Sequence, residues 1–488
     1  MKDPHPATAD LAYLSAGEAT RAMAAGTLTS RALVDALLLR IEALDGPGTD
    51  VGLCAIAGLS ADAREVADER DRERAAGQMR GPLHGVPVLI KDNVEAVGLP
   101  GTAGSTALLG RTARDAPLVT RLRDAGMVLL GSTNLSQWAN LRSPRSSSGW
   151  SATGGLVGNP WSLDRSAGGS SSGSGAAVAA GYAPLAVGTE TDGSIVCPAS
   201  VNGLVGLKPT VGAVSAACVV PIAASQDTPG PMARTVVDVA LLYSVLAGVE
   251  DASVTDTPRV AFATNWRTGH PSTDDHAATV VSWLEESGVS VARRELVEPG
   301  KSEQEDELAV LVAELYDDLG AYLAGRPGDG VRSVADVMAY EDEHRDVEQP
   351  YFGHEFFAMA VASGGRAGEA YAPARQRNLE WAITTCLTPG LDGVDVIVAP
   401  AYGPAWKSDL IVGGHPGPAS CATMAPAIAG WPILSVPIGL VQGLPVGLAV
   451  IARPGCEAAI LDVARRVELA VNARAPLSHP SFARPTRG

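Results

Sequence analysis

The segment of residues 164–200, DRSAGGSSSGSGAAVAAGYAPLAVGTETDGSIVCPAS, restricts the possible folds of this chain more than any other. A run so rich in glycine and serine is typical of a flexible linker. Here, however, it continues directly into a small-residue helix, AAVAAG, an apolar strand, PLAVG, and a second Gly-Ser turn. This continuity predicts a folded unit, with glycines that let the backbone approach a ligand closely at positions 168, 169, 173, 175 and 193.

Residues 169–173 of this segment also match the pattern GxSxG, which in one class of hydrolases places a nucleophilic serine between a strand and a helix. The preceding residues, NPWSLDRSA, do not have a strand pattern. Such a site also needs an acid and a histidine later in the chain, and the downstream histidines stand mostly in polar, loop-like sequence. This interpretation is therefore the weaker one.

A second informative stretch is HGVPVLIKDNV, residues 84–94. The bounded apolar run of residues 86–90 predicts a short buried strand. Lys91 stands at its end and has two interpretations. In the first, its aliphatic stem covers the core while its amine reaches solvent, as in most lysines. In the second, the amine is buried and has a functional role. The stretch alone favours the first interpretation.

The order of apolar and polar stretches predicts an α/β fold in four parts. Residues 1–80 are predicted to form a helical arm, and residues 81–249 alternate short strands with helices and hold the glycine-rich segment. Residues 250–390 are more polar and acidic, and we expect a helical insertion that covers the site. Residues 391–488 return to strands, VDVIVAP, PILSVPI and LPVGLAVIA, and a closing helix that completes the core.

Charge and composition narrow the possible partners. The net charge is −17, so the average field of the protein repels phosphates and anionic membranes, and we expect neither a nucleic-acid nor a membrane partner. The six cysteines are scattered without metal-ligand or disulfide spacing. The N-terminal stretch lacks an apolar signal core, and no run reaches the roughly 20 apolar residues of a membrane helix. A cytoplasmic protein is expected.

Several blocks together resemble the amidase signature family. They are GPLHGVPVLIKDNV, GSTNLSQWA, the segment from GGSSSGSG to TDGSIVCPA, GLKPTVG, DTPGPMART and AGWPILSVPIGLVQGLPVGLAVIA. The order and number of these blocks make the resemblance specific. Within the family, SGWSATGG, GTETDGSIVCPASVNGLVGLKPTVG and SQDTPGPMART are most similar to bacterial peptide amidases, which remove the amide from peptide C-termini. The resemblance implies an α/β/α sandwich around a large mixed sheet.

The resemblance also implies a role for three residues. Ser194 of TDGSI corresponds to the nucleophile, Ser170 to a serine that follows a cis peptide bond, and Lys91 to the terminal base of a Ser-Ser-Lys triad. The two serines lie 24 positions apart, as the family pattern expects. A serine hydroxyl needs an adjacent base, and a lysine serves as one only when burial keeps it neutral. The resemblance thus reverses the interpretation of Lys91 as a simple strand end.

The turn TETDGS is also expected to supply an oxyanion hole, because it places the backbone N-H groups of Thr191, Asp192 and Gly193 around one point next to Ser194. Much of the family has Gly at the position of Asp192 and Arg at that of Val196. The Asp192 carboxylate could repel an acid product, bind a substrate N-H, or simply orient the turn through a backbone hydrogen bond, and the last is slightly favoured.

The loop RSPRSSSGWS, residues 142–151, corresponds to a family segment near the scissile bond. Ser146, Ser148 and Trp150 are therefore candidate substrate contacts, although Trp150 could equally be a core residue. Further pocket residues are expected from the insertion. No metal or organic cofactor is expected.

The sequence thus predicts a serine amidohydrolase that acts on small-molecule or short-peptide amides, with primary amides first, as a monomer or homodimer. Anilides and carbamates remain alternatives, because the same triad cleaves them and the acyl pocket decides. An amidotransferase component that passes ammonia to a partner, or a non-catalytic amide-binding scaffold, are less favoured alternatives.

Overall fold

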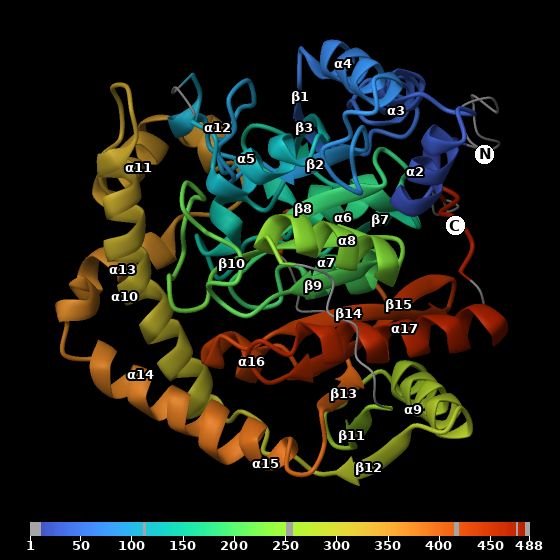
Figure 1. The fold of residues 1–488 in the computed structure, drawn as a ribbon. Coiled ribbons are helices and arrows are strands. Elements are labelled where there is room, and N and C mark those ends of the chain that lie inside the picture. The colour runs from blue at the N-terminus through green and yellow to red at the C-terminus, as the bar shows by residue number, and fades with distance from the viewer. Residues whose placement is uncertain (1–10, 111–113, 250–256, 414–418, 475–476, 484–488) are drawn as a thin grey trace, which may run out of the picture.

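The computed structural model describes residues 11–110, 114–249, 257–413, 419–474 and 477–483. An 11-stranded sheet crosses the whole molecule (Figure 1). In spatial order its strands are β1 (Ile56–Leu59), β3 (Val128–Thr133), β2 (Pro87–Lys91), β8 (Leu185–Glu190), β10 (Thr228–Ala233), β9 (Val205–Lys208), β14 (Ile433–Val441), β15 (Leu444–Ala452), β13 (Val396–Pro400), β11 (Arg259–Ala263) and β12 (Ser290–Arg294). The sheet is mixed: β2 pairs in parallel with β3 and β8, whereas β14 and β15 are antiparallel.

Helices cover both faces of this sheet, because its central strands are apolar on both sides. Along β2, Val88 and Ile90 face one core and Leu89 faces the other. The first face packs against α5 (Pro117–Asp124), α8 (Val236–Ala247), α9 (Pro271–Glu286) and α17 (Glu457–Arg474). The opposite face packs against α3 (Ser30–Leu44), α4 (Ala63–Ala75), α6 (Ser172–Ala179), α7 (Val196–Asn202), α16 (Met424–Ala429) and the π-helix η4 (Glu380–Leu387). The expected α/β/α sandwich is confirmed.

The N-terminal region is more than a helical arm. Besides α2 (Ala16–Ala24), α3 and α4, it contributes the edge strand β1, which pairs antiparallel with β3. Only four residues long and partly exposed, β1 has too short an apolar pattern to be recognised in the sequence. The first ten residues of the predicted arm lie outside the described residues.

The region of residues 250–390 is likewise not a single helical insertion. Its first part, β11, α9 and β12, extends the main sheet, since β11 pairs in parallel with both β12 and β13. The helical part, residues 301–390, is called the cap from here on. Besides η4, its helices are α10 (Lys301–Gly325), α11 (Val334–Glu343), α12 (Arg345–Glu348), α13 (Glu355–Ser363), η3 (Gly365–Ala367), α14 (Tyr371–Leu379) and α15 (Thr388–Gly390).

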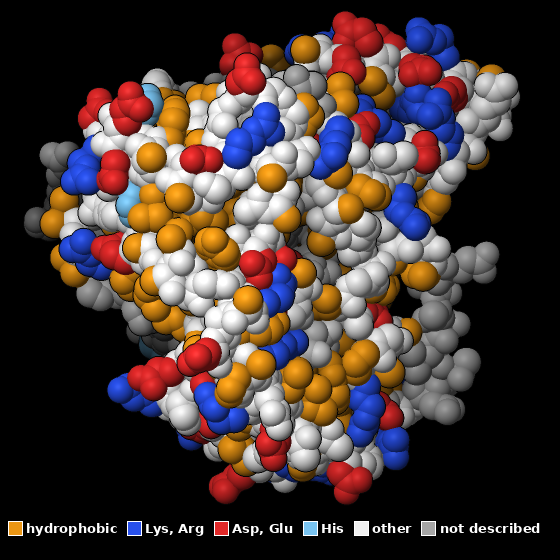
Figure 2. Space-filling view, turned by 90° about the vertical axis from the view of Figure 1, so that its left-hand side faces the viewer, with side chains coloured by type: hydrophobic (Ala, Val, Ile, Leu, Met, Phe, Trp, Pro, Cys, Tyr) orange, Lys and Arg blue, Asp and Glu red, His pale blue; other side chains and the backbone are white. Residues whose placement is uncertain are grey.

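The cap forms one edge of the molecule, with α10, α11, α13 and α14 in a row beside the sandwich (Figure 1). Its apolar side packs on core loops: Val312, Leu315 and Leu319 of α10 join a cluster with Ala103 and Trp138. Figure 2 faces this edge and shows acidic, basic and hydrophobic side chains mixed over its outer surface. The apolar side of α10 is therefore the surface by which the cap is attached to the core.

The loops between β3 and α6 contain short elements close to the site. They are the turn η2 (Gln137–Asn140) and the strands β4 (Trp150–Ser151), β5 (Gly155–Leu156), β6 (Gly158–Asn159) and β7 (Ser162–Ser166), with the turn η1 (Thr106–Leu108) nearby under the cap. Among the described residues, no helix combines the length and apolar character needed to cross a bilayer.

Candidate active site

Lys91 is the last residue of β2 and is completely buried. Its Nζ atom donates hydrogen bonds to Ser170 Oγ at 2.7 Å, to Thr189 Oγ1 at 2.9 Å and to the Thr189 carbonyl at 3.3 Å. Burial lowers the pKa of Lys91 to about 7, although the nearby charges of Asp227 and Glu190 act in the opposite direction. Around neutral pH, a large fraction of this amine is uncharged.

Ser170 lies where the glycine-rich segment turns into α6, and the Gly169-Ser170 peptide bond is cis, as the resemblance implies. Its carbonyl accepts a hydrogen bond from the backbone N-H of Ser136 at 3.0 Å. The next residue, Ser171, donates its N-H to the Ser194 carbonyl at 3.1 Å. The two segments that carry the serines are thus joined directly by their backbones.

Ser194 lies on the tight turn between β8 and α7. Gly193 in this turn has φ +74°, and an added Cβ would lie 2.6 Å from Tyr402 Oη, so only glycine fits without strain. Glu190 fixes the far side of the turn, because its Oε2 accepts the backbone N-H groups of Ile195 at 2.6 Å and Val196 at 2.8 Å. The position of Ser194 is therefore set by backbone and by a buried carboxylate.

The N-H groups on this turn are available for a ligand. No described residue accepts a hydrogen bond from the backbone N-H of Asp192, Gly193 or Ser194. Thr191 is held in place by its side chain, whose Oγ1 donates to Asp227 Oδ1 at 2.6 Å. Unpaired backbone N-H groups on a tight turn are the usual hydrogen-bond donors of an oxyanion hole.

A cavity of about 590 Å³ opens over these residues. Its lining includes Ser170, the turn from Thr191 to Ser194, and Cys197. Its remaining lining consists of Ala139, Asn140, Leu141, Ser143, Pro144, Ser146, Ser148, Gly169, Ile222, Leu311, Phe356, Tyr402, Trp406 and Ala419. The lining is mainly small or apolar, and among these residues there is neither a lysine nor an arginine.

Three of the lining side chains carry an oxygen that is shielded from solvent and has no hydrogen-bond partner among the described residues. They are Asn140 Oδ1, Ser146 Oγ and Asp192 Oδ1. Leaving a buried polar atom unpaired costs about 1–3 kcal/mol, so such atoms are rarely kept without a use. A ligand could pair with them only after their side chains turn toward the cavity.

Carboxylates lie close to the turn. Burial raises the pKa of Asp192, while a hydrogen bond with Thr423 and the charge of Lys208 lower it. Burial also raises the pKa of Asp227 to about 6, although this carboxylate accepts the N-H groups of Ile222 and Ala223 at 2.8 Å and 3.0 Å. Lys208 acts on Asp192 and Lys91 lies near Asp227, so groups of both signs of charge lie around the cavity.

The structure brings most of the predicted residues together. Ser170, Ser194, the three turn residues, Ser146 and Ser148 line one cavity, and Lys91 lies directly behind Ser170. Trp150 is not among the described residues that line it. Its ring packs at right angles to Tyr351 and at a steep angle to Phe352, with ring centres 5.6 Å and 5.1 Å away, which makes it a core residue.

The insertion contributes less to the cavity than the sequence predicts. Leu311 and Phe356 come from it, whereas most of the lining comes from residues 139–148, 169–197 and 402–419. Sequence reasoning also missed Thr189 and Asp227. Both stand inside quoted motifs, GTETDGS and SQDTPGP, so the motif positions themselves were the available indication. Among the described residues, no group of three or more His, Cys, Asp or Glu could hold a metal ion.

Comparison with known proteins gives consistent matches. The model of the family described as Amidase matches residues 32–461. The crystal structure of native peptide amidase from Stenotrophomonas maltophilia superposes with a TM-score of 0.87 at 39% identity, covering 98% of this chain and 99% of that one. A peptide amidase in complex with the competitive inhibitor chymostatin gives a TM-score of 0.88 at 40% identity over 97% of this chain and all of that one.

A relative named for a different activity is also similar along its length. It is a glutamyl-tRNA(Gln) amidotransferase component from Symbiobacterium thermophilum, which is 35% identical over 486 residues. The match covers 92% of this chain and 95% of that protein.

Proposed function

This chain belongs to the amidase family and is an amide-hydrolysing enzyme, and we propose that it works through an acyl-enzyme on Ser194 with Ser170 and Lys91 as the proton relay. The observation that carries the proposal is the buried contact of 2.7 Å between Lys91 Nζ and Ser170 Oγ beside the turn that presents Ser194. A buried amine with a lowered pKa, hydrogen-bonded to a serine in a cavity, has the properties of a general base.

The reaction then proceeds in two steps, acylation of Ser194 and hydrolysis of the acyl-enzyme. Neutral Lys91 accepts the proton of Ser170, Ser170 accepts that of Ser194, and the Ser194 oxygen attacks the amide carbonyl carbon. As the C-N bond breaks, the proton returns from Lys91 through Ser170 to the departing nitrogen, which leaves as ammonia or an amine. Water then attacks the ester carbonyl by the same relay and releases a carboxylic acid.

The negative charge that develops on the carbonyl oxygen is held by backbone N-H groups in the turn of Thr191, Asp192 and Gly193. Support comes from the unpaired N-H groups of Asp192 and Gly193, on a turn that the Glu190 carboxylate and the Asp227–Thr191 hydrogen bond keep in place. Fixed donors need no reorganisation during the reaction, and each typically contributes about 3 kcal/mol to lowering the barrier.

For the substrate, we propose a primary carboxamide whose acyl part is a short peptide, so that the reaction releases ammonia from a peptide C-terminus. The polar residues Asn140, Ser146 and Asp192 in the cavity lining support a polar acyl group, because a peptide backbone offers both N-H and C=O partners. The apolar lining, which includes Leu141 and Trp406, supports space for side chains. Anilides and carbamates are the alternative substrates with the same relay.

A glutaminase role in an amidotransferase is the second candidate, and the similarity to the amidotransferase component speaks for it. Free glutamine carries an α-carboxylate, which proteins usually bind with a cation. Among the described residues, the cavity lining offers no lysine or arginine, and Val196 stands where much of the family has arginine. The net charge of −17 also disfavours a tRNA-bound partner, so we propose a monomer or homodimer that acts on free small amides without nucleic acid or membrane.

The test is a product assay by mass spectrometry on a C-terminally amidated dipeptide, an acyl anilide and an aryl carbamate, with Ser194→Ala as the inactive control. Ammonia and free dipeptide acid from the first substrate alone would support the proposal. Cleavage of the anilide or carbamate without deamidation would keep the relay and reject the peptide substrate. Turnover by Ser194→Ala at the wild-type rate would reject the mechanism.

A further inference from the structure

A segment of the cavity wall has an unusual backbone. Trp138, Ala139 and Asn140 have φ values of +51°, +52° and +74°, so three successive residues other than glycine adopt the left-handed conformation. L-residues visit this region rarely and normally one at a time. Residues 138–142 are called the wall segment here, since Ala139, Asn140 and Leu141 line the cavity. A conformation of this kind persists only if its surroundings enforce it.

The first enforcing contact comes from the cap. The indole Nε1 of Trp138 donates a hydrogen bond to Glu341 Oε1 of α11 at 2.9 Å, in a buried site. The ring of Trp138 also packs edge-on against Phe357 of α13, with ring centres 5.7 Å apart. On the core side, the backbone N-H of Trp138 donates to the Ala103 carbonyl at 2.9 Å. The first residue of the wall segment is therefore clamped between cap and core.

A second set of contacts flanks the segment. Gln137 donates its amide N-H to the Glu348 carboxylate of α12, and Arg142 Nη1 donates to Gln137 Oε1 at 2.6 Å. Arg142, which is fully buried, also donates to the backbone carbonyl of Glu348. Its own carbonyl accepts the N-H of Phe356 at 3.0 Å, and Phe356 reaches the cavity. Both ends of the wall segment are thus tied to the cap.

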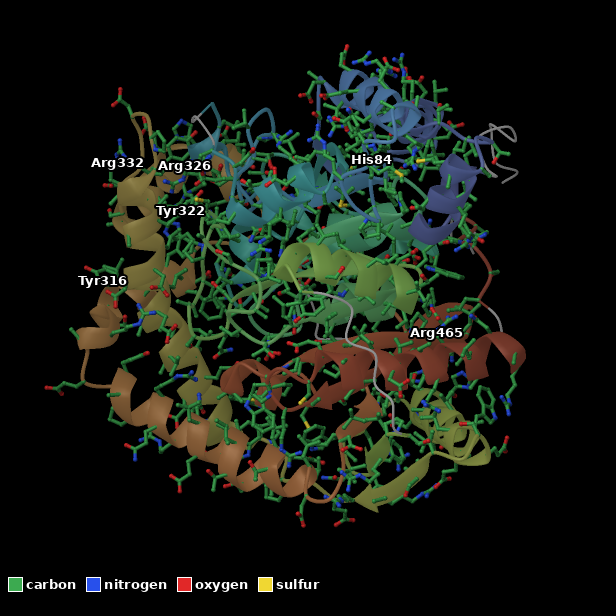
Figure 3. The ribbon with its side chains drawn as sticks, in the orientation of Figure 1. His84, Tyr316, Tyr322, Arg326, Arg332 and Arg465 are labelled. Atoms are coloured by element: carbon green, nitrogen blue, oxygen red, sulfur yellow. The ribbon has the colours of Figure 1, made fainter. Side chains whose placement is uncertain are left out.

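The cap carboxylates are themselves fixed. Glu348 accepts the backbone N-H of Thr106 at 2.7 Å, and the Glu341 carboxylate is 2.9 Å from His354 Nδ1. Figure 3 shows a separate attachment near the C-terminal end of α10, where Tyr322 and Arg326 lie together, and Arg326 donates to the Gly101 carbonyl at 3.0 Å. The cap is therefore a rigid support for the wall segment.

We propose that Glu341 and Glu348 are positioning residues, which hold the wall segment in its left-handed conformation through Trp138, Gln137 and Arg142 and so decide which acyl groups fit the cavity. The proposal rests on the proposed function, because it concerns selectivity at the same site. It explains how the cap can control the substrate while contributing Leu311 and Phe356 to the lining.

The test compares two rates in variants that release the wall segment. Trp138→Phe keeps the aromatic packing and removes the hydrogen bond to Glu341, and Gln137→Met removes both contacts of the amide. Tyr371→Phe is the matched control, because it removes a hydrogen bond of 2.7 Å to Glu314 within the cap, away from the wall segment. One rate is kcat/KM for an amidated tripeptide, and the other is inactivation by methanesulfonyl fluoride, whose small group requires the nucleophile alone.

The expected result for Trp138→Phe is a fall of about 10-fold in kcat/KM for the tripeptide, since small displacements of positioning groups have large kinetic effects. Inactivation by the sulfonyl fluoride should keep its wild-type rate. Tyr371→Phe should lower Tm and leave the ratio of the two rates unchanged. If Trp138 had a purely structural role, Trp138→Phe would give this same result. Trp138→Phe keeps the test open if Gln137→Met does not fold.

An unchanged ratio in Trp138→Phe, or an equal change in Tyr371→Phe, would overturn the positioning role. Either result leaves the proposed function intact as long as the wild type hydrolyses amides and is labelled on Ser194. A wild type that neither hydrolyses the amide nor reacts at Ser194 would instead reject the proposed function on which this inference depends.

Discussion

Lys91 Nζ lies 2.7 Å from Ser170 Oγ, and both side chains are closed off from solvent. The strand β2 carries Lys91 to this point and pairs in parallel with β8, whose end leads into the turn of Ser194. The carboxyl ends of two neighbouring parallel strands thus bring the Lys91 amine and the turn of Ser194 to the same edge of the sheet, with Ser170 placed against the amine by the start of α6.

The first prediction concerns the pH dependence of activity. Burial lowers the pKa of Lys91 to about 7, and only the neutral amine can accept a proton. We therefore expect kcat/KM to rise as pH increases through about 7 and then to level off. Lys91→Arg should be inactive at every pH, because a guanidinium does not lose its proton. A pH profile of kcat/KM on one amide checks both, and a flat wild-type profile would contradict the role of Lys91.

Asp227 should tune this profile. Its negative charge raises the pKa of Lys91, in opposition to burial. Asp227→Asn removes the charge and can keep its contacts, with the amide oxygen facing the N-H groups of Ile222 and Ala223 and the amide nitrogen facing Thr191 Oγ1. The rising limb of the kcat/KM profile is expected to move to lower pH in this variant. A limb that stays in place or moves to higher pH would show that Asp227 does not act on Lys91 through its charge.

Lys91 should also make the free energy of unfolding depend on pH. Its pKa is about 7 in the folded protein and lies near 10.5 when the residue is exposed, so the unfolded chain binds the extra proton between these values. The free energy of unfolding therefore increases with pH in this window because of Lys91. In Lys91→Met this contribution is absent, and the variant's Tm relative to wild type should fall as pH rises from about 7 to about 10. Thermal melts at several pH values measure this trend, and a constant difference would refute it.

Gly193→Ala should distort the turn that leads into Ser194. The φ of +74° is unfavourable for alanine, and the new Cβ would lie 2.6 Å from Tyr402 Oη. We expect kcat to fall by about 100-fold, comparable with the loss of one oxyanion donor. Adding Tyr402→Phe removes the steric part alone and should restore activity partly. Measured kcat values for the two single variants and the double variant give the coupling, and strict additivity would argue against the contact.

Ser146→Ala tests the unpaired polar atoms of the cavity. The Ser146 hydroxyl has no partner among the described residues, so its removal should leave Tm unchanged or slightly higher. If the hydroxyl binds substrate, KM for an amidated peptide should rise by about 5-fold to 10-fold, the ordinary effect of one lost hydrogen bond. Steady-state kinetics and a melt on the same preparation are sufficient. An unchanged KM would exclude Ser146 from substrate binding.

Much of the sandwich could be predicted because its strands are short apolar runs bounded by glycine, proline or polar residues. The predicted strand over 86–90 is found as β2 (Pro87–Lys91), and the predicted runs near the C-terminus are found as β13, β14 and β15. The strands β11 and β12 were not predicted. β12, SVARR, is at the edge of the sheet, and three of its five side chains are polar, so its pattern resembles that of a loop.

The site was predictable where the sequence concentrates it in a motif, and unpredictable where it depends on distant contacts. Ser170, Ser194 and the turn of Thr191 to Gly193 are close in sequence, and they lie together in the cavity. The contact of Trp138 with Glu341 joins residues about 200 positions apart, and neither residue has a local pattern that indicates the other. Trp150 illustrates the opposite case: its place in a motif suggested a substrate contact, and only its packing against Phe352 shows it to be core.

The parallel pairing of β2 with β8 also has a consequence for how this enzyme can change over time. The backbones of β2, which ends at Lys91, and of β8, which leads into the turn of Ser194, are held side by side by a hydrogen-bonded ladder, with neighbouring strands about 4.8 Å apart. Mutations in the cap and in the wall segment do not alter that spacing. Mutations in the cap and the wall segment can therefore change which substrates fit, while the strand arrangement at Lys91 and Ser194 stays the same. Selectivity can then evolve without a change in reactivity.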